Sequence, residues 1–222
     1  MFNNISQIKE RIKNTEVLFF DLDGTLIDTE PLYFRFWKEA CHFYGFSLND
    51  EQALSLRSRD RGSALEFFNE ISGGTLDYVK ARTKRTELMN EYFKEHPIQL
   101  KAGVIEFLSS LKQLNKKLFI VTANTVARCK EIIEPLNLSQ YFNGIISAKD
   151  VKRGKPFPDV YLKACDHVHQ LPSKIVVFED SPNGLKSASD SGCYTVMVED
   201  MTPYIEELNY IDGVISSFMD LL

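Results

Sequence analysis

Five short apolar runs, separated by longer amphipathic stretches, constrain the fold of this 222-residue chain more than any other feature. Each run has the length of a strand, is rich in β-branched and aromatic residues, and is apolar on both faces. The runs lie at residues 17–20, 118–121, 144–146, 175–178 and 194–198. Helical periodicity occupies residues 104–114, 126–136, 158–167 and 182–191. The alternation predicts an α/β core with a doubly wound, Rossmann-like parallel sheet.

Residues 31–97 depart from this alternation. Apolar side chains recur there at helical spacing, as at Phe34, Trp37 and Cys41, and no segment has a convincing strand pattern. An all-helical insert explains the stretch, with its entry just after the first strand and its exit near Pro97. We therefore expect residues 1–30 and 98–222 to form the core and residues 31–97 to form a smaller helical domain.

Charge and composition exclude several classes of protein. The formal net charge of −5 provides no basic field for a nucleic acid, so we expect none as a partner. The four cysteines are far apart and form no zinc or disulfide framework. No stretch approaches the ~20 apolar residues of a membrane helix, and residues 1–14 lack the apolar core of a secretory signal. We expect a soluble, cytoplasmic protein without a membrane partner, either a monomer or a weak homodimer.

Chemically active side chains follow the apolar runs. Ligands of an open parallel sheet bind beyond the carboxyl ends of its strands, so residues at these positions should converge on one edge. The first run is followed by Asp21 and Asp23, the second by Thr122, Ala123 and Asn124, and the fourth by Glu179 and Asp180; Lys155 follows the third run after a short loop.

Four carboxylates in one crevice would repel one another and raise each other's pKa values. A bound cation removes this conflict, and an all-oxygen site that also faces a phosphate suits Mg²⁺. Asp21 and Asp180 are the first candidates for carboxylate ligands, with Glu179 beside them.

The same set of residues suits phosphoryl transfer, which mainly requires positioning and neutralisation of the phosphate charge. Asp21 can attack phosphorus and form an aspartyl-phosphate, while Asp23 protonates the leaving oxygen and later activates the acceptor. The candidates for holding the phosphate are the Thr122 hydroxyl, the Lys155 ammonium and the groups that follow the second strand, at Ala123 and Asn124.

Four ordered segments resemble the motifs of the haloacid dehalogenase superfamily: residues 19–25 (FFDLDGT), Thr122, Lys155-Pro156 and residues 178–181 (FEDS). More narrowly, the chain is similar to the β-phosphoglucomutase-like branch, whose helical cap is inserted just after the first motif. The resemblance implies that Asp21 is the nucleophile, Asp23 the general acid and base, and Thr122 and Lys155 the phosphate ligands. It also implies that Mg²⁺ binds to the side chains of Asp21 and Asp180 and to the main-chain carbonyl of Asp23, with Glu179 beside them.

The expected activity is that of a phosphatase of a small phosphorylated metabolite, most reasonably a sugar phosphate. The alternative is a sugar-phosphate mutase. Tyr33 stands where the mutases of this branch have a histidine, which favours the phosphatase, although Phe34-Arg35 and Trp37 resemble the mutase cap helix. Arg61 lies about where the mutases have an arginine that binds a second phosphate, so it is a candidate substrate ligand in the cap. The alternative for Arg61 is a solvated basic face.

Two non-enzymatic alternatives explain less. A signalling receiver module also has clustered acids, a hydroxyl and a lysine, but its phosphorylated aspartate would follow a middle strand, and the helical insert would be unexplained. A homologue that only binds is disfavoured because every charged role is filled.

Two residues have structural alternatives, since Asn124 could cap a helix and Ser181-Pro182 has the pattern of a helix start.

Overall fold

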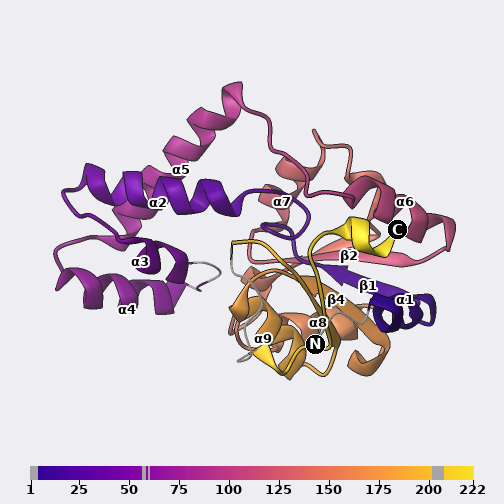
Figure 1. Ribbon diagram of the computed structural model, residues 1–222. Helices are drawn as coiled ribbons and strands as arrows, with labels where there is room; N and C mark the ends of the chain where they lie inside the picture. The colour runs from indigo at the N-terminus through magenta and orange to yellow at the C-terminus, as the bar shows by residue number, and fades with distance from the viewer. Residues whose placement is uncertain (1–4, 57–58, 60, 202–207) are drawn as a thin grey trace. The chain divides into compact units, whose positions relative to one another are not determined.

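The computed structural model describes the chain except residues 1–4, 57–58, 60 and 202–207 (Figure 1). The chain divides into two compact units. One consists of Met1–Asp28 and Leu100–Leu222, and the other of Thr29–Gln99. None of the described helices is both long and apolar enough to cross a membrane.

The first unit contains a sheet with the strand order β3-β2-β1-β4-β5-β6, in which every neighbouring pair is parallel. This order changes direction beside β1, as in a doubly wound fold, so the predicted fold class is confirmed. The sequence pattern did not reveal the sixth strand. The strands are β1 (Val17–Phe20), β2 (Lys117–Thr122), β3 (Gly144–Ser147), β4 (Ile175–Glu179), β5 (Tyr194–Val198) and β6 (Gly213–Ile215).

Helices cover both faces of this sheet (Figure 1). Their starts follow ordinary capping chemistry: Thr125 accepts a hydrogen bond from the N–H of Arg128, and Ser181 accepts one from the N–H of Gly184. Thr125 therefore caps α7, and Asn124 does not. The described α-helices of this unit are α1 (Ile5–Lys13), α6 (Val104–Gln113), α7 (Val126–Ile133), α8 (Asp159–His167) and α9 (Pro182–Asp190). Its described 3₁₀ helices are η1 (Ser139–Tyr141), η2 (Ala148–Asp150), η3 (Pro172–Lys174) and η5 (Phe218–Leu221).

Alternate residues of β1 face two different cores. Val17 and Phe19 belong to a buried cluster that includes Tyr161 of α8. Phe20 points to the opposite face, where its ring stacks on Phe178 with centroids 5.0 Å apart and lies 6.1 Å from Phe218. Both faces of β1 are thus packed up to its last residue, which makes the carboxyl end of this strand a rigid support.

The second unit has its own apolar core and, among its described residues, only helices. Trp37 lies at the centre, with its ring 5.4 Å from the ring of Phe68 and 6.0 Å from that of Tyr78. A core of this kind explains why the apolar residues of this stretch recur at helical spacing. The helices are α2 (Glu30–Phe43), α3 (Asp50–Ser55), α4 (Arg61–Ser72) and α5 (Tyr78–Glu95).

Truncation of Phe218 should measure how strongly the aromatic face holds the core together. Phe218 is fully buried against Phe20, Phe107 and Phe178. We expect Phe218→Ala to lower the free energy of unfolding by about 3–5 kcal/mol, because it removes a buried ring and leaves a cavity. Urea unfolding measures the change. The neighbouring Met219→Ala is the control, since Met219 is 54% exposed and its loss should change stability by less than about 0.5 kcal/mol.

Candidate active site

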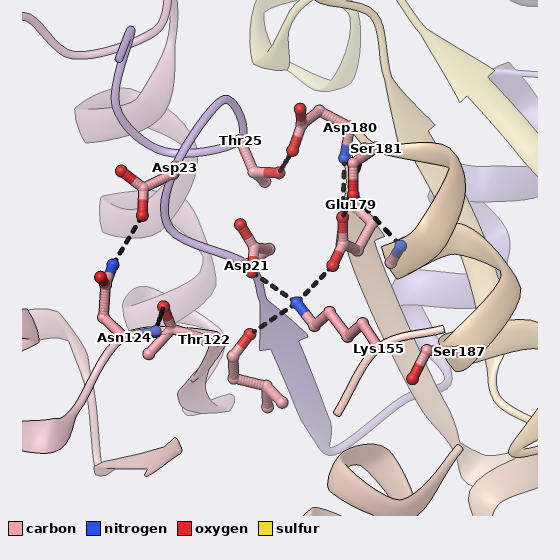
Figure 2. A network of polar contacts seen from close by, with 12 residues as sticks. Asp21, Asp23, Thr25, Thr122, Asn124, Lys155, Glu179, Asp180, Ser181 and Ser187 are labelled. Carbon is pink, nitrogen blue, oxygen red and sulfur yellow. Dashed lines mark hydrogen bonds and ion pairs between the residues drawn. The ribbon is translucent and has the colours of Figure 1, made fainter. Parts of the chain in front are cut away.

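Asp21 lies at the carboxyl end of β1, in the centre of the sheet (Figure 2). Its main-chain N–H donates to the carbonyl of Phe178 at 3.0 Å, so the pairing between β1 and β4 continues past the last residue of β1. Asp21 as a whole residue is only 7% exposed. Burial raises its pKa well above the ordinary value; Lys155 lowers this pKa by a smaller amount, and Glu179 raises it further. The backbone thus holds a carboxylate where its charge is poorly hydrated.

Lys155 is the cation of the site. Its Nζ lies 2.5 Å from Oδ1 of Asp21, 2.5 Å from Oε1 of Glu179 and 3.2 Å from the carbonyl oxygen of Val121. These three acceptors match the three N–H groups of an ammonium, so its position is fixed. Burial lowers the pKa of Lys155, but the charges of Asp21 and Glu179 raise it more, so this pKa lies above its ordinary value. Lys155 stays positively charged across the physiological range.

Both carboxylate oxygens of Glu179 are occupied by donors from the protein. Oε1 accepts from Lys155 and from the Tyr161 hydroxyl at 3.0 Å. Oε2 accepts from the N–H of Asp180 at 3.1 Å and from the N–H and hydroxyl of Ser181 at 3.4 and 3.2 Å. This geometry makes Glu179 the anchor of Lys155, and its role as a metal ligand stays a prediction.

Tyr161 supports the candidate site and was not recognised from the sequence. It is fully buried in α8, its hydroxyl contacts Glu179, and Lys155 Nζ lies 5.3 Å from the centre of its ring. A tyrosine on the apolar face of a predicted helix is the feature that could have indicated this role, because a buried hydroxyl needs a polar partner. Its neighbourhood in the sequence does not say which partner that is.

The carboxylates of Asp21, Glu179 and Asp180 form a buried cluster whose oxygens lie within 4.8 Å of one another. Thr25 donates from its hydroxyl to Oδ1 of Asp180 at 3.0 Å, which orients that carboxylate. The donor set is all oxygen, and two of its three carboxylates share the ammonium of Lys155. A hard divalent ion such as Mg²⁺ fits this set, because it prefers oxygen ligands and would add positive charge to a cluster of three buried carboxylates.

Asp23 and the residues that follow β2 form the second half of the site. Nδ2 of Asn124 donates to Oδ2 of Asp23 at 2.6 Å, and the N–H of Asn124 donates to the Thr122 hydroxyl at 3.1 Å (Figure 2). Thr122 is 1% exposed, whereas Ala123 is exposed. Except for Arg61, the predicted site residues therefore come from the carboxyl edge of one sheet. Their roles remain predictions.

Arg61 is the remaining predicted site residue. It begins α4, and its side chain lies outside the described part of the chain, as does Arg57. Arg59 lies between these two arginines in the sequence and contacts its own unit: its Nε donates to the carbonyl of Ser55, and its guanidinium lies 4.6 Å from the centre of the Phe67 ring. A structural role accounts for Arg59, and the prediction for Arg61 stays a prediction.

A doubly wound α/β sheet with an inserted helical unit, and with acids, a lysine and a hydroxyl at its carboxyl edge, defines a class of phosphate-handling enzymes. The family model for haloacid dehalogenase-like hydrolases matches residues 18–198. The chain belongs to this family.

Relatives agree with this assignment, and solved structures share the fold. A phosphorylated carbohydrates phosphatase of Thermotoga maritima is 31% identical over 80% of this chain and 82% of its own length. A β-phosphoglucomutase of Bacillus subtilis is 24% identical, over 86% of each chain. The crystal structure of a β-phosphoglucomutase from Clostridium difficile superimposes with a TM-score of 0.77 at 22% identity, covering 94% of this chain and 93% of the other. The present chain is thus an enzyme, a phosphatase or a phosphomutase.

Gly184 offers a test of the Glu179 anchor. A Cβ at this position would lie 2.0 Å from the carboxylate of Glu179. In an ordinary helix, Gly→Ala stabilises by up to about 1 kcal/mol. We expect the opposite sign for Gly184→Ala, a loss of about 1–3 kcal/mol, because Glu179 must leave a filled site.

Chemical denaturation measures this change in stability. Lys186→Ala is the control in the same helix, because Lys186 is exposed. A stabilising Gly184→Ala would contradict the close packing of Gly184 against Glu179.

Proposed function

We propose that the chain is a magnesium-dependent phosphatase of a small phosphorylated metabolite, most reasonably a sugar phosphate, and that it works through an aspartyl-phosphate on Asp21. The observation that carries the proposal is the buried Asp21–Lys155–Glu179 chain at the end of β1, with Asp23 two residues away. The matched phosphatase of T. maritima, whose name specifies phosphorylated carbohydrates, supports the substrate class.

The chemistry follows from the positions of the two aspartates. The Asp21 carboxylate attacks phosphorus, and the bond from phosphorus to the leaving oxygen breaks. Asp23 gives its proton to that oxygen, and the metabolite leaves as an alcohol. Asp23 then takes a proton from water, the water oxygen attacks phosphorus, and phosphate leaves Asp21. Covalent catalysis thus divides one difficult displacement into two easier ones.

The remaining residues of the site handle charge and position. Lys155 places an ammonium against the attacking carboxylate, and Glu179 together with Tyr161 keeps it there. The Thr122 hydroxyl and main-chain groups of the segment that follows it are proposed to bind the phosphoryl oxygens, as the sequence predicts. When bound, Mg²⁺ would supply positive charge to the transferring phosphoryl group, and Asp21 and Asp180 would hold it, together with the main-chain carbonyl of Asp23.

A sugar-phosphate mutase is the second candidate, supported by the similarity to the B. subtilis β-phosphoglucomutase. It would use the same first step and return the phosphoryl group to a sugar. Tyr33 occupies the place of the mutase histidine, and the Arg85 guanidinium lies 4.8 Å from the centre of its ring. We favour the phosphatase because a tyrosine stands where the mutases have a histidine. Conversion of β-glucose 1-phosphate to glucose 6-phosphate without release of inorganic phosphate would reverse this preference.

Replacement of the nucleophile is the direct test of the proposed chemistry. We expect Asp21→Asn to lower kcat for phosphate release from a panel of sugar phosphates by roughly 10⁴-fold or more, because an amide cannot form the covalent intermediate. Asp28→Asn is the matched control, since Asp28 is exposed in the same segment, and it should keep nearly all activity. Wild-type rates in Asp21→Asn would refute the covalent mechanism.

Binding of magnesium should be visible without any turnover. A ligand that binds only the folded state stabilises it by about 2.7 kcal/mol at a concentration 100 times its Kd. We therefore expect millimolar Mg²⁺ to raise the melting temperature of the wild type by several degrees. Asp180→Asn should remove most of this increase, because it removes a ligand charge. Equal increases in the wild type and in this variant would exclude Asp180 as a ligand.

A further inference from the structure

A contact between Asn124 and Asp23 joins two loops that are 101 residues apart in the sequence (Figure 2). Nδ2 of Asn124 lies 2.6 Å from Oδ2 of Asp23. Asp23 follows β1, Asn124 follows β2, and both residues are half-buried. The NH₂ group of an amide donates and a carboxylate oxygen accepts, so Asn124 is the donor in this contact.

The main chain of Asn124 is fixed on both sides. Its N–H donates to the Thr122 hydroxyl at 3.1 Å, and its carbonyl accepts a hydrogen bond from the Ser147 hydroxyl at 2.6 Å. Ser147 is 1% exposed, ends β3, and pairs in register with Thr122 at the end of β2. The direction of the Asn124 side chain is therefore set by two neighbouring strands of the sheet.

We propose that Asn124 is a positioning residue that orients the carboxylate of Asp23 for proton transfer, and that its side chain is not a phosphate ligand. The inference rests on the proposed role of Asp23 as general acid and base. A proton donor is effective only when it points at the leaving oxygen, and small errors in this alignment are costly. Asn124 restricts the rotation of a carboxylate that lies on a loop.

If Asn124 acts through Asp23, its loss should affect substrates differently, according to whether the leaving group needs a proton. A sugar phosphate releases an alkoxide, which must be protonated as the bond to phosphorus breaks. p-Nitrophenyl phosphate releases a stable phenolate, which needs no proton from the enzyme. Loss of alignment at Asp23 should therefore slow transfer from a sugar phosphate and leave transfer from the aryl phosphate almost unchanged. A residue that binds phosphate would affect both substrates alike, because both carry the same phosphoryl group.

The experiment compares kcat/KM for a hexose 6-phosphate and for p-nitrophenyl phosphate, with Mg²⁺ present. This ratio covers the steps up to formation of the phosphoenzyme, so the later use of Asp23 as a base does not enter. General acid catalysis contributes about 10²–10⁴-fold. We expect Asn124→Ala to lose part of this contribution, so that kcat/KM for the hexose phosphate falls roughly tenfold. The same variant should change kcat/KM for the aryl phosphate by less than about twofold. Ser147→Ala should show a smaller effect with the same substrate dependence.

A double-mutant cycle supplies the second measurement. In the Asp23→Asn background, Asn124→Ala should cause no further loss with the hexose phosphate, because its only effect passes through Asp23. Asn124→Leu keeps the approximate size of the side chain and removes the donor without adding charge, so it should reproduce the substrate dependence even if the alanine variant folds poorly. Thermal unfolding of each variant is recorded alongside.

Equal losses on the two substrates would overturn the inference, and so would an equal cost of Asn124→Ala with and without the Asp23 carboxylate. Unchanged kinetics in both Asn124 variants would overturn it as well. A different result would refute the proposed function itself: Asp21→Asn would keep its activity.

Discussion

One ammonium group shared by two buried carboxylates is the interaction on which the rest of this site depends. Lys155 is 4% exposed and contacts both Asp21 and Glu179. Burial of three charges is costly, and removal of one partner leaves the others uncompensated. The surrounding donors from Tyr161, Asp180 and Ser181 offset that cost at Glu179 alone. Asp21 is left with an excess of negative charge, which suits both a metal ligand and a nucleophile.

The parallel sheet explains why so few residues suffice to build the site. Four neighbouring strands, in the order β3-β2-β1-β4, end at the same edge, and each ends at or just before a polar residue of the site or its support. Ser147, Thr122, Asp21 and Asp180 thus lie near one another without long side chains to bridge them. The packing of Phe20 and Phe178 beneath the edge fixes the two strands that carry the acids.

Much of this arrangement could be predicted from the sequence, because strands buried on both faces are recognisable as apolar runs and ligands gather where such strands end. Five strands were placed to within about a residue, and Asp21, Lys155 and Asp180 converge as expected. The three residues of β6 were too short a run to recognise, and α1 was overlooked in a polar segment. The anchoring of Glu179 and the contact of Asn124 with Asp23 depend on side-chain direction, which no spacing in the sequence encodes. Arg61 was placed by resemblance alone, and its side chain lies outside the described residues.

The position of β1 in the sheet also has a consequence for how the protein emerges during synthesis. β1 pairs with β2 on one side and with β4 on the other, and residues 29–99 separate it from β2. On the ribosome, β1 must therefore wait for both neighbours, the second of which begins only at Ile175. Until then Asp21 lacks β4 beside it and the Glu179 carboxylate that holds Lys155 in place. The edge that carries the acids is thus among the last parts of the nascent chain to form, and a chain truncated before β4 would lack both Glu179 and Asp180.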